Sequence, residues 1–435
     1  MLAFLGFSMI IVFMYLIISK RMSALVALIV IPILFALFGG FGPGIGEMML
    51  EGVKQVAPTG VMLMFAILYF GIMIDAGLFD PLVGKILTVV KGDPLKIVIG
   101  TALLSMMVAL DGDGTTTYMI TVSAMLPLYQ RLGMNPLILT CIAMLSFGFM
   151  NMTPWGGPTA RAVSALQLNV ADVFTPLIPV MAGGALWTLF TAYILGKRER
   201  KRIGVAEIQY SEEDKLTMSQ QSAALETESF KRPKLLWINL LLTVSLLVCL
   251  IMSVLPLPIL FMIAFVIALM INYPKLDDQK ERISNHAGNV LAVVGLVFAS
   301  GIFTGILSGT EMVDEMANSL VAIIPESLGS YFAVITAVTS IPFTYFMAND
   351  PYYYGVLPIL AQTAEAYGVD PAEIARASIL GQPVHAMSPL MASAYLLVGM
   401  AGVEFGDHQK FIFKWALGSC FVMIAIALLI GVITF

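Results

Sequence analysis

Apolar runs separated by short polar gaps make up most of this chain. A membrane-spanning helix needs about 20 apolar residues, and several of the runs approach or exceed that length. They lie at 3–19, 23–40, 60–79, 136–168, 176–196, 235–255, 257–273, 288–308, 371–403 and 411–434. The pattern predicts an all-α polytopic membrane protein with membrane lipid around it.

The composition agrees with this prediction. Of the 435 residues, 59% are hydrophobic and 12% are charged, whereas soluble domains are about 45–50% apolar and about 25% charged. The first run has neither a basic stretch before it nor a small-residue cleavage site, so we expect a retained helix rather than a secretory signal. The three cysteines lie in apolar runs without CxxC spacing, which argues against a disulfide framework or metal cluster. The net charge of −5, with basic residues in loops, indicates no nucleic-acid partner.

One long polar segment, 197–234, divides the chain into two halves. It begins with KRERKR and continues with the composition of a solvated linker. By the positive-inside rule, this linker and the basic loop at 19–21 face the cytoplasm. Five crossings then precede the linker, which places the N-terminus outside. Glu47 and Glu51 would fall in an outer loop.

The two halves resemble each other. Three pairs of residues share an offset of 235 positions: Pro136 with Pro371, Pro154 with Pro389, and Asp172 with Asp407. If each half crosses the membrane an odd number of times, the second copy lies upside down relative to the first. The sequence thus predicts inverted-topology repeats at 1–196 and 235–435, an arrangement typical of secondary transporters.

Four polar interruptions break the apolar pattern. They read DGDGTTT at 111–117, NMTPWGGPTAR at 151–161, FMANDPYYYG at 346–355 and QPVHAMSP at 382–389. Their flanks predict two re-entrant hairpins, at 94–131 and 328–366, and two broken helices, at 136–168 and 371–403. Non-helical peptide at membrane depth is tolerated only where it is buried or lines a cavity. We therefore expect the four interruptions to meet at one site.

The interruptions supply neutral and basic groups suited to an anionic substrate. Half-helix N-termini expose N–H groups that attract anions, and C-termini expose carbonyls that attract cations. The substrate-binding candidates are Gly112, Gly114, Thr115, Thr116, Thr117, Asn151, Thr153, Gly156, Gly157, Thr159, Arg161, Asn349 and Ser388.

Acidic residues and a histidine in the same stretches are candidates for coupling. An ionised carboxylate at the bilayer centre costs at least about 2.5–3.5 kcal/mol, so Asp111, Asp113 and Asp350 are expected to meet a metal ion, a proton or Arg161. Either of the first two could cap the second hairpin arm, which does not exclude a second role. Arg161 could be a structural counter-ion rather than a substrate contact. His385 could transfer protons or be a buried, satisfied histidine.

Asp75 and Asp80 have a different setting. They follow the apolar run at 60–79 and precede an amphipathic segment. We expect both at the cytoplasmic membrane boundary rather than at a ligand site.

Three stretches, ALDGDGTTTYMITVSAMLPLYQRLGMNPL, MNMTPWGGPTARAVSAL and GQPVHAMSPLMAS, resemble the bacterial citrate–metal:proton symporter family of the ion transporter superfamily. The resemblance covers nearly the whole chain. It implies a transporter rather than an enzyme, which imports citrate with a divalent metal of the magnesium or calcium type, driven by protons, across the bacterial cytoplasmic membrane. The metal would be co-transported, with no permanently bound cofactor.

The superfamily's folds imply an elevator-type homodimer. In each protomer, scaffold helices at 3–79 and 235–308 would hold a moving unit built from the hairpins and broken helices. The dicarboxylate branch of the superfamily has Ser-Asn-Thr triplets at both hairpin tips, where this chain reads GDGTTT and MANDPY. Sodium sites therefore do not carry over, and acidic tips suit a substrate that brings its own cation.

Two other functions compete with this interpretation. One is a sodium- or proton-coupled carrier of free di- or tricarboxylates. The other is a membrane-embedded hydrolase with Asp111 and Asp113 as a catalytic pair, which neither the repeat nor the paired breaks predicts.

Overall fold

The structure is a computed structural model that describes residues 1–19, 21–78, 80–81, 84–85, 92–205, 230–252, 254–322 and 326–434. These residues form helices joined by turns, and the described part contains no strand. Seven helices there are long and apolar enough to cross a membrane: Ile45–Asp75, Pro94–Asp111, Val170–Ile203, Pro233–Leu250, Leu276–Gly309, Leu328–Phe346 and Phe405–Leu429. The prediction of an all-α polytopic membrane protein is confirmed.

The first half begins with three helices and continues with the first hairpin, the first broken helix and a long closing helix. Their bounds are α1 Leu2–Ile18, α2 Ala24–Phe38, α3 Ile45–Asp75, α5 Pro94–Val108, η1 Ala109–Asp111, α6 Gly114–Arg131, α7 Pro136–Met150, α8 Gly157–Leu166 and α9 Val170–Ile203. Asp93 and Asn135 cap α5 and α7, and a proline follows each cap. This order is favourable because proline at the first helical position has no N–H to satisfy.

The second half follows the linker. Its elements are η3 Pro233–Leu235, α11 Leu236–Ile251, α12 Leu257–Asn272, α13 Leu276–Gly309, α14 Met312–Val321, η4 Glu326–Tyr331, α15 Phe332–Phe346, η5 Pro351–Val356, α16 Leu357–Glu365, α17 Pro371–Ile379, α18 Gln382–His385, α19 Ala392–Ala401 and α20 Phe405–Leu429. The predicted alignment holds, since α7 and α17 begin at Pro136 and Pro371. At the same offset, α8 and α19 begin at Gly157 and Ala392.

Several helices extend beyond their apolar runs. Glu47 and Glu51, expected in an outer loop, lie in the first turns of α3. The segment 197–203, expected to open the linker, continues α9 to Ile203. Lysine, arginine and glutamate are good helix formers, and basic residues favour a helix C-terminus. Residues 206–229 of the expected linker lie outside the described residues.

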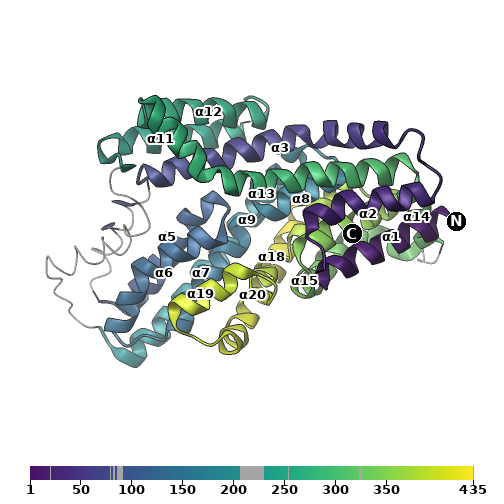
Figure 1. Ribbon diagram of the computed structural model, residues 1–435. Coiled ribbons are helices and arrows are strands. Elements are labelled where there is room, and N and C mark those ends of the chain that lie inside the picture. Colours follow the sequence, from purple (N-terminus) through teal and green to yellow (C-terminus); the bar gives the residue numbers. More distant parts are fainter. Residues whose placement is uncertain are drawn as a thin grey trace.

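Helices α3 and α13 run side by side along one edge of the molecule, with α11 and α12 next to them (Figure 1). Their backbones approach closely at glycines. A Cβ atom on Gly52 would lie 1.9 Å from the carbonyl oxygen of Gly301 and 2.8 Å from Cα of Gly305. Small residues permit this kind of contact between membrane helices. The two helices thus form a tightly packed pair.

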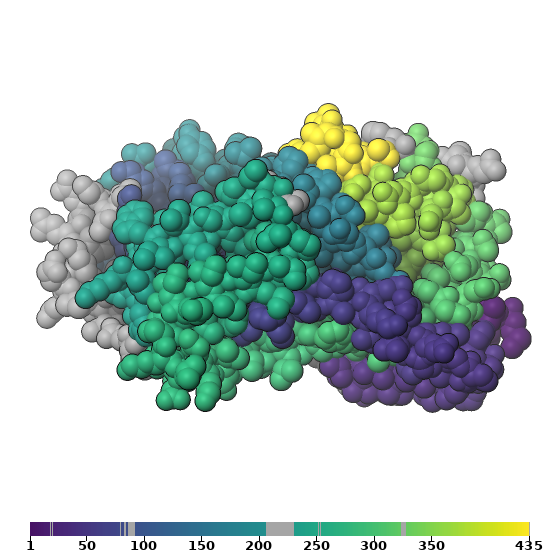
Figure 2. Space-filling model, turned by 90° about the horizontal axis from the view of Figure 1, so that it is seen from above, coloured from purple at the N-terminus to yellow at the C-terminus, as the bar shows by residue number. Residues whose placement is uncertain are grey.

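The α11–α13 region also presents a broad apolar surface, and its residues form the teal and green area at the left of Figure 2. Trp237 is 77% exposed and Leu241 is 68% exposed. Met270 on α12 is 63% exposed. Large exposed apolar surfaces are rare in soluble monomers. A surface of this kind is consistent with a polytopic membrane protein.

Each of the four predicted interruptions contains non-helical residues, but the first half of the fourth differs from the prediction because Gln382–His385 forms the short helix α18. The first hairpin turns at 109–113, where Gly112 has a φ of 80°. The first broken helix is non-helical at 151–156. The second hairpin is non-helical at 347–348 and continues through the π-helical turn η5. The second broken helix is non-helical at 380–381 and again at 386–391.

Candidate functional site

All four interruptions line one cavity of about 360 Å³, which is called the central cavity below. Its lining residues are Gly112, Asp113, Gly114, Thr115, Phe147, Asn151, Gly157, Arg161, Ala348, Asn349, Asp350, His385, Leu390, Met391, Ala392 and Ser393. Pockets of about 300–1,000 Å³ are the usual size for small ligands. The fold therefore brings together segments that are far apart in sequence.

The tip of the first hairpin is held by its own carboxylates. Asp113 Oδ2 accepts hydrogen bonds from the backbone N–H and the hydroxyl of Thr116, both at 2.8 Å. Asp111 Oδ1 accepts from the Asp113 N–H at 2.9 Å, and the Thr117 hydroxyl donates to the Asp113 carbonyl at 2.8 Å. Asp113 therefore caps α6, as one of the alternatives expected. Its side chain is also exposed in the cavity.

The first broken helix is closed by Asn151, whose side-chain oxygen accepts from the Gly157 N–H at 3.2 Å. A Cβ atom on Gly156 would lie 1.9 Å from the Asn151 carbonyl oxygen, so the turn requires glycine there. Thr159 donates to the Met152 carbonyl at 2.9 Å. Thr153 is buried, and its hydroxyl has no partner among the described residues.

Trp155 connects this break to the first hairpin and to helices α3 and α12. Its indole N–H donates to the Leu110 carbonyl of the first hairpin at 2.7 Å. Its ring packs against Phe70 of α3 and Phe261 of α12, with centroids 5.0 and 5.2 Å apart. One side chain therefore joins the break, the hairpin and the α3–α12 group.

An ion pair joins the first broken helix to the second hairpin. Arg161 Nε lies 2.6 Å from Asp350 Oδ1, and the two side chains are 22% and 18% exposed. Arg161 Nη1 also donates to the Gly157 carbonyl at 3.1 Å. Both members of the pair line the cavity. Arg161 thus has a carboxylate counter-ion and remains positioned to meet a ligand.

The second broken helix holds the second hairpin through side chains. Gln382 Nε2 donates to the Tyr353 hydroxyl at 3.0 Å and faces Asn349 Oδ1 at 3.4 Å. His385 is buried and bonds through Nδ1 to the Thr344 carbonyl, while its Nε2 has no described partner. Ser388 donates to the Tyr345 carbonyl at 2.6 Å. Of these residues, Asn349 and His385 reach the cavity.

The structure separates the predicted site residues into two groups. Those outside the lining are Asp111, Thr116, Thr117, Thr153, Gly156, Thr159 and Ser388. Several of them brace the tips and breaks through the bonds given above.

The sequence analysis missed six lining residues: Phe147, Ala348, Leu390, Met391, Ala392 and Ser393. The repeat offset contained a signal for some of them. It aligns Gly157, a predicted site residue, with Ala392 at the start of α19.

Asp75 is buried inside the protein and lies outside the cavity lining. Its Oδ2 lies 3.1 Å from Arg282 Nη1 and 3.0 Å from His286 Nε2. The polar first half of α13 extends alongside the end of α3, and the sequence pattern did not predict that extension. Asp80 pairs with Lys231 at 2.9 Å and its side chain is 52% exposed.

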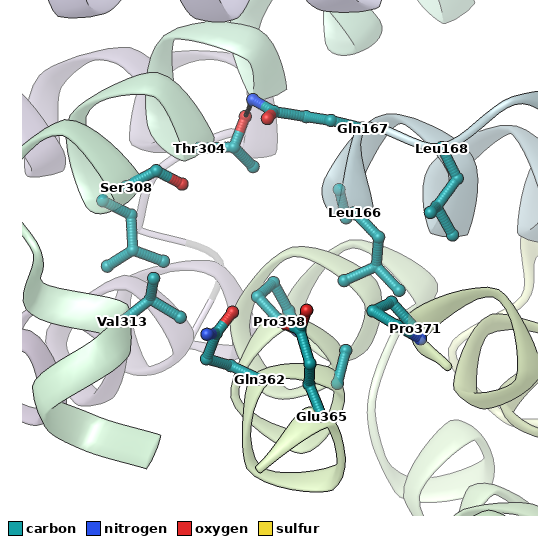
Figure 3. A pocket seen from close by; sticks show the side chains of 13 residues that line it. Leu166, Gln167, Leu168, Thr304, Ser308, Val313, Pro358, Gln362, Glu365 and Pro371 are labelled. Atoms are coloured by element: carbon teal, nitrogen blue, oxygen red, sulfur yellow. Dashed lines mark hydrogen bonds between the residues drawn. The ribbon is translucent and has the colours of Figure 1, made fainter. Parts of the chain in front are cut away.

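A second cavity of about 200 Å³ lies where α8 ends, bounded by α13, α14 and α16. Figure 3 shows Gln167 extending toward Thr304, with a distance of 3.3 Å from Nε2 to Oγ1. Gln362 and Glu365 of α16 lie across from them. Gln167 has a φ of 55°, which ends α8 with a left-handed residue. No predicted site residue lines this cavity.

The helical fold, the paired breaks and the central cavity define a polytopic membrane transporter. The chain belongs to the CitMHS citrate transporter family, whose model matches residues 13–381. The predicted family is confirmed. Because this is a family of transporters, the hydrolase alternative is excluded.

Two relatives from Bacillus subtilis (strain 168) align with the whole chain. The protein named "Citrate transporter" is 64% identical over 435 residues, covering 100% of both chains. The "Mg(2+)/citrate complex secondary transporter" is 60% identical over 435 residues, covering 100% of this chain and 99% of the relative. Among solved structures, the YdaH transporter of Alcanivorax borkumensis is similar, with a TM-score of 0.60 and 14% identity over 87% of this chain and 86% of that one. That structure, described as having an unusual topology, supports the fold alone.

Proposed function

We propose that this protein imports citrate as a complex with a divalent metal ion, in symport with protons, across a bacterial cytoplasmic membrane. The names of the relatives support the substrate class. The observation that carries the proposal is the charge pattern of the cavity, which combines one guanidinium group with two carboxylates, Asp113 and Asp350. A citrate trianion bound to a divalent cation has a single net negative charge but exposes both signs.

The citrate carboxylates would meet the positive groups of the cavity. The N-terminal residues of α6, α8 and α19 all line it, through Gly114, Gly157 and Ala392. Helix N-termini offer free N–H groups and partial positive charge to anions. Arg161 adds a full positive charge beside α8. Thr115, Asn151 and Asn349 add neutral hydrogen-bonding groups.

The metal would meet the acidic groups. Magnesium and calcium both prefer oxygen ligands, and magnesium usually keeps several waters while bound by one or two carboxylates. Asp113 uses Oδ2 to cap α6, which leaves the other carboxylate oxygen as a candidate ligand. Citrate supplies further oxygens, so the protein need not enclose the ion. Asp113, Asp350 and His385 are the candidate proton carriers.

Transport would occur by alternating access between a scaffold and a moving unit. The scaffold would comprise the helices at 3–79 and 235–308, and the moving unit the hairpins and broken helices of the two repeats. The 197–234 segment would face the cytoplasm, and two copies would form a homodimer.

A cross-link across the second cavity tests this division. Gln167 lies at the end of a broken helix and Thr304 lies on scaffold helix α13. With the native cysteines replaced by serine, a short bifunctional thiol reagent on a Gln167→Cys/Thr304→Cys variant should reduce citrate uptake at least about tenfold. Each single-cysteine variant serves as the control. Full uptake by a cross-linked protein would show that the two elements do not move relative to each other.

The function itself is tested by uptake of radiolabelled citrate into proteoliposomes with an imposed inward proton gradient. Magnesium, calcium and metal-free buffers are compared. We expect uptake that needs both the metal and the gradient. Metal-independent, sodium-dependent uptake would instead establish a sodium-coupled carrier of free di- or tricarboxylates.

A further inference from the structure

The Arg161–Asp350 ion pair lies within the wall of the central cavity. Two of the guanidinium's nitrogens are engaged by the protein, Nε by Asp350 Oδ1 at 2.6 Å and Nη1 by the Gly157 carbonyl at 3.1 Å. The two charged residues come from different repeats and are 189 residues apart. A citrate carboxylate that binds Arg161 at Nε therefore competes with a carboxylate of the protein.

The surroundings of the pair are acidic on the other side of the cavity. Asp113 lines the same cavity from the first hairpin tip. Its two described side-chain contacts are with Thr116, and neither carries a positive charge. Among the described lining residues, Arg161 is the one arginine or lysine. A carboxylate that loses its contact with Arg161 therefore needs another source of positive charge, and the metal ion of the ligand is one such source.

We propose that Asp350 is the residue that makes the carrier select metal-bound over metal-free citrate. A substrate carboxylate replaces Asp350 on Arg161, and the displaced Asp350 carboxylate is then compensated by the metal ion of the complex. This inference rests on the proposed function and identifies which residue sets its substrate class.

The exchange affects the two forms of citrate differently. Replacing one carboxylate by another on a guanidinium conserves the type of hydrogen bond. Removing the partner of a buried charge is strongly unfavourable when nothing replaces it. Metal-free citrate displaces Asp350 and adds further negative charge beside it, so the cost is not offset. The metal complex displaces Asp350 and supplies a cation at the same time.

The test is citrate binding to purified full-length protein, measured by calorimetry with magnesium and with a chelator in its place. The quantity compared is the ratio of the two dissociation constants. In Asp350→Asn, which removes the charge and keeps the side-chain size, metal-free citrate should gain at least about tenfold relative to the magnesium complex. Asp350→Glu, which keeps the charge, should retain the selectivity of the wild type.

Glu365→Gln is the matched control. It removes the same charge from the same hairpin, and Glu365 is exposed at the second cavity rather than the central one. Its ratio should equal that of the wild type. If Asp350→Asn does not fold, as judged by size-exclusion chromatography, Asp350→Ser provides a second neutral variant with the same expected result.

The outcomes distinguish the inference from the proposed function. A wild type that prefers the magnesium complex, with an unchanged ratio in the folded neutral variants, overturns the role of Asp350 alone. A wild type that binds both forms equally overturns metal–citrate selectivity and the inference with it. If Glu365→Gln also lost the preference for the magnesium complex over metal-free citrate, general electrostatics rather than Asp350 would set that preference.

Discussion

The two hairpin tips occupy corresponding places in the predicted repeat, but their aspartates have different bonding partners. At the first tip, Asp111 and Asp113 bond to backbone and hydroxyl groups no more than three residues away. At the second tip, Asp350 reaches Arg161 in the other half of the chain. The predicted repeat offset therefore indicates where a tip lies. The individual residues determine which carboxylate is neutralised by the protein and which is left for a cation.

The largest effect is expected from removing Arg161, the cation that pairs with Asp350 of the second tip. Arg161→Gln should reduce metal–citrate uptake at least about 100-fold, because it removes the one arginine or lysine of the described lining. It should also lower the unfolding temperature, since Asp350 would then be left without its partner in a partly buried pair. The measurements are proteoliposome uptake and thermal unfolding in detergent.

A second substitution in that background sharpens the comparison. Adding Asp350→Asn should recover part of the lost stability without recovering uptake, because the unpaired carboxylate is then gone. Adding Asp113→Asn should not. Equal recovery from both would mean that the two tips do not differ in their pairing with Arg161.

A smaller effect is expected at the first tip. Asp113→Asn should reduce metal–citrate uptake about 10- to 50-fold, because it removes a charge that no described side chain neutralises. The unfolding temperature should change little, since asparagine caps a helix about as well as aspartate. A large loss of stability with uptake retained would make Asp113 a structural cap alone.

The smallest effect should come from removing the Thr116 hydroxyl, which donates a hydrogen bond to Asp113. Thr116→Val removes the 2.8 Å hydroxyl contact and keeps the shape of the side chain. It should lower the free energy of unfolding by about 0.5–1.5 kcal/mol and leave uptake within about threefold. Uptake as low as that of Asp113→Asn would place the hydroxyl itself in the substrate site.

Much of this architecture could be predicted from the sequence, because proline and glycine mark the breaks and the offset aligns the two halves. The ends of α3, α9 and α13 could not, since hydropathy reports the lipid-facing part of a helix and charged residues extend it further. The partner of Arg161 was one of several possibilities. Choosing among them required knowing that α8 and the second tip approach each other, which depends on packing throughout the fold.

The lack of space for a side chain at Gly156 limits which mutations of the gene can be tolerated. Every amino-acid substitution at this position adds at least a Cβ atom, and that atom would lie 1.9 Å from the Asn151 carbonyl oxygen. If growth depends on this carrier, each missense change of the Gly156 codon should then be as harmful as the loss of Arg161. A residue outside the cavity lining would be among the least variable in the gene, because its neighbours leave no space for a side chain.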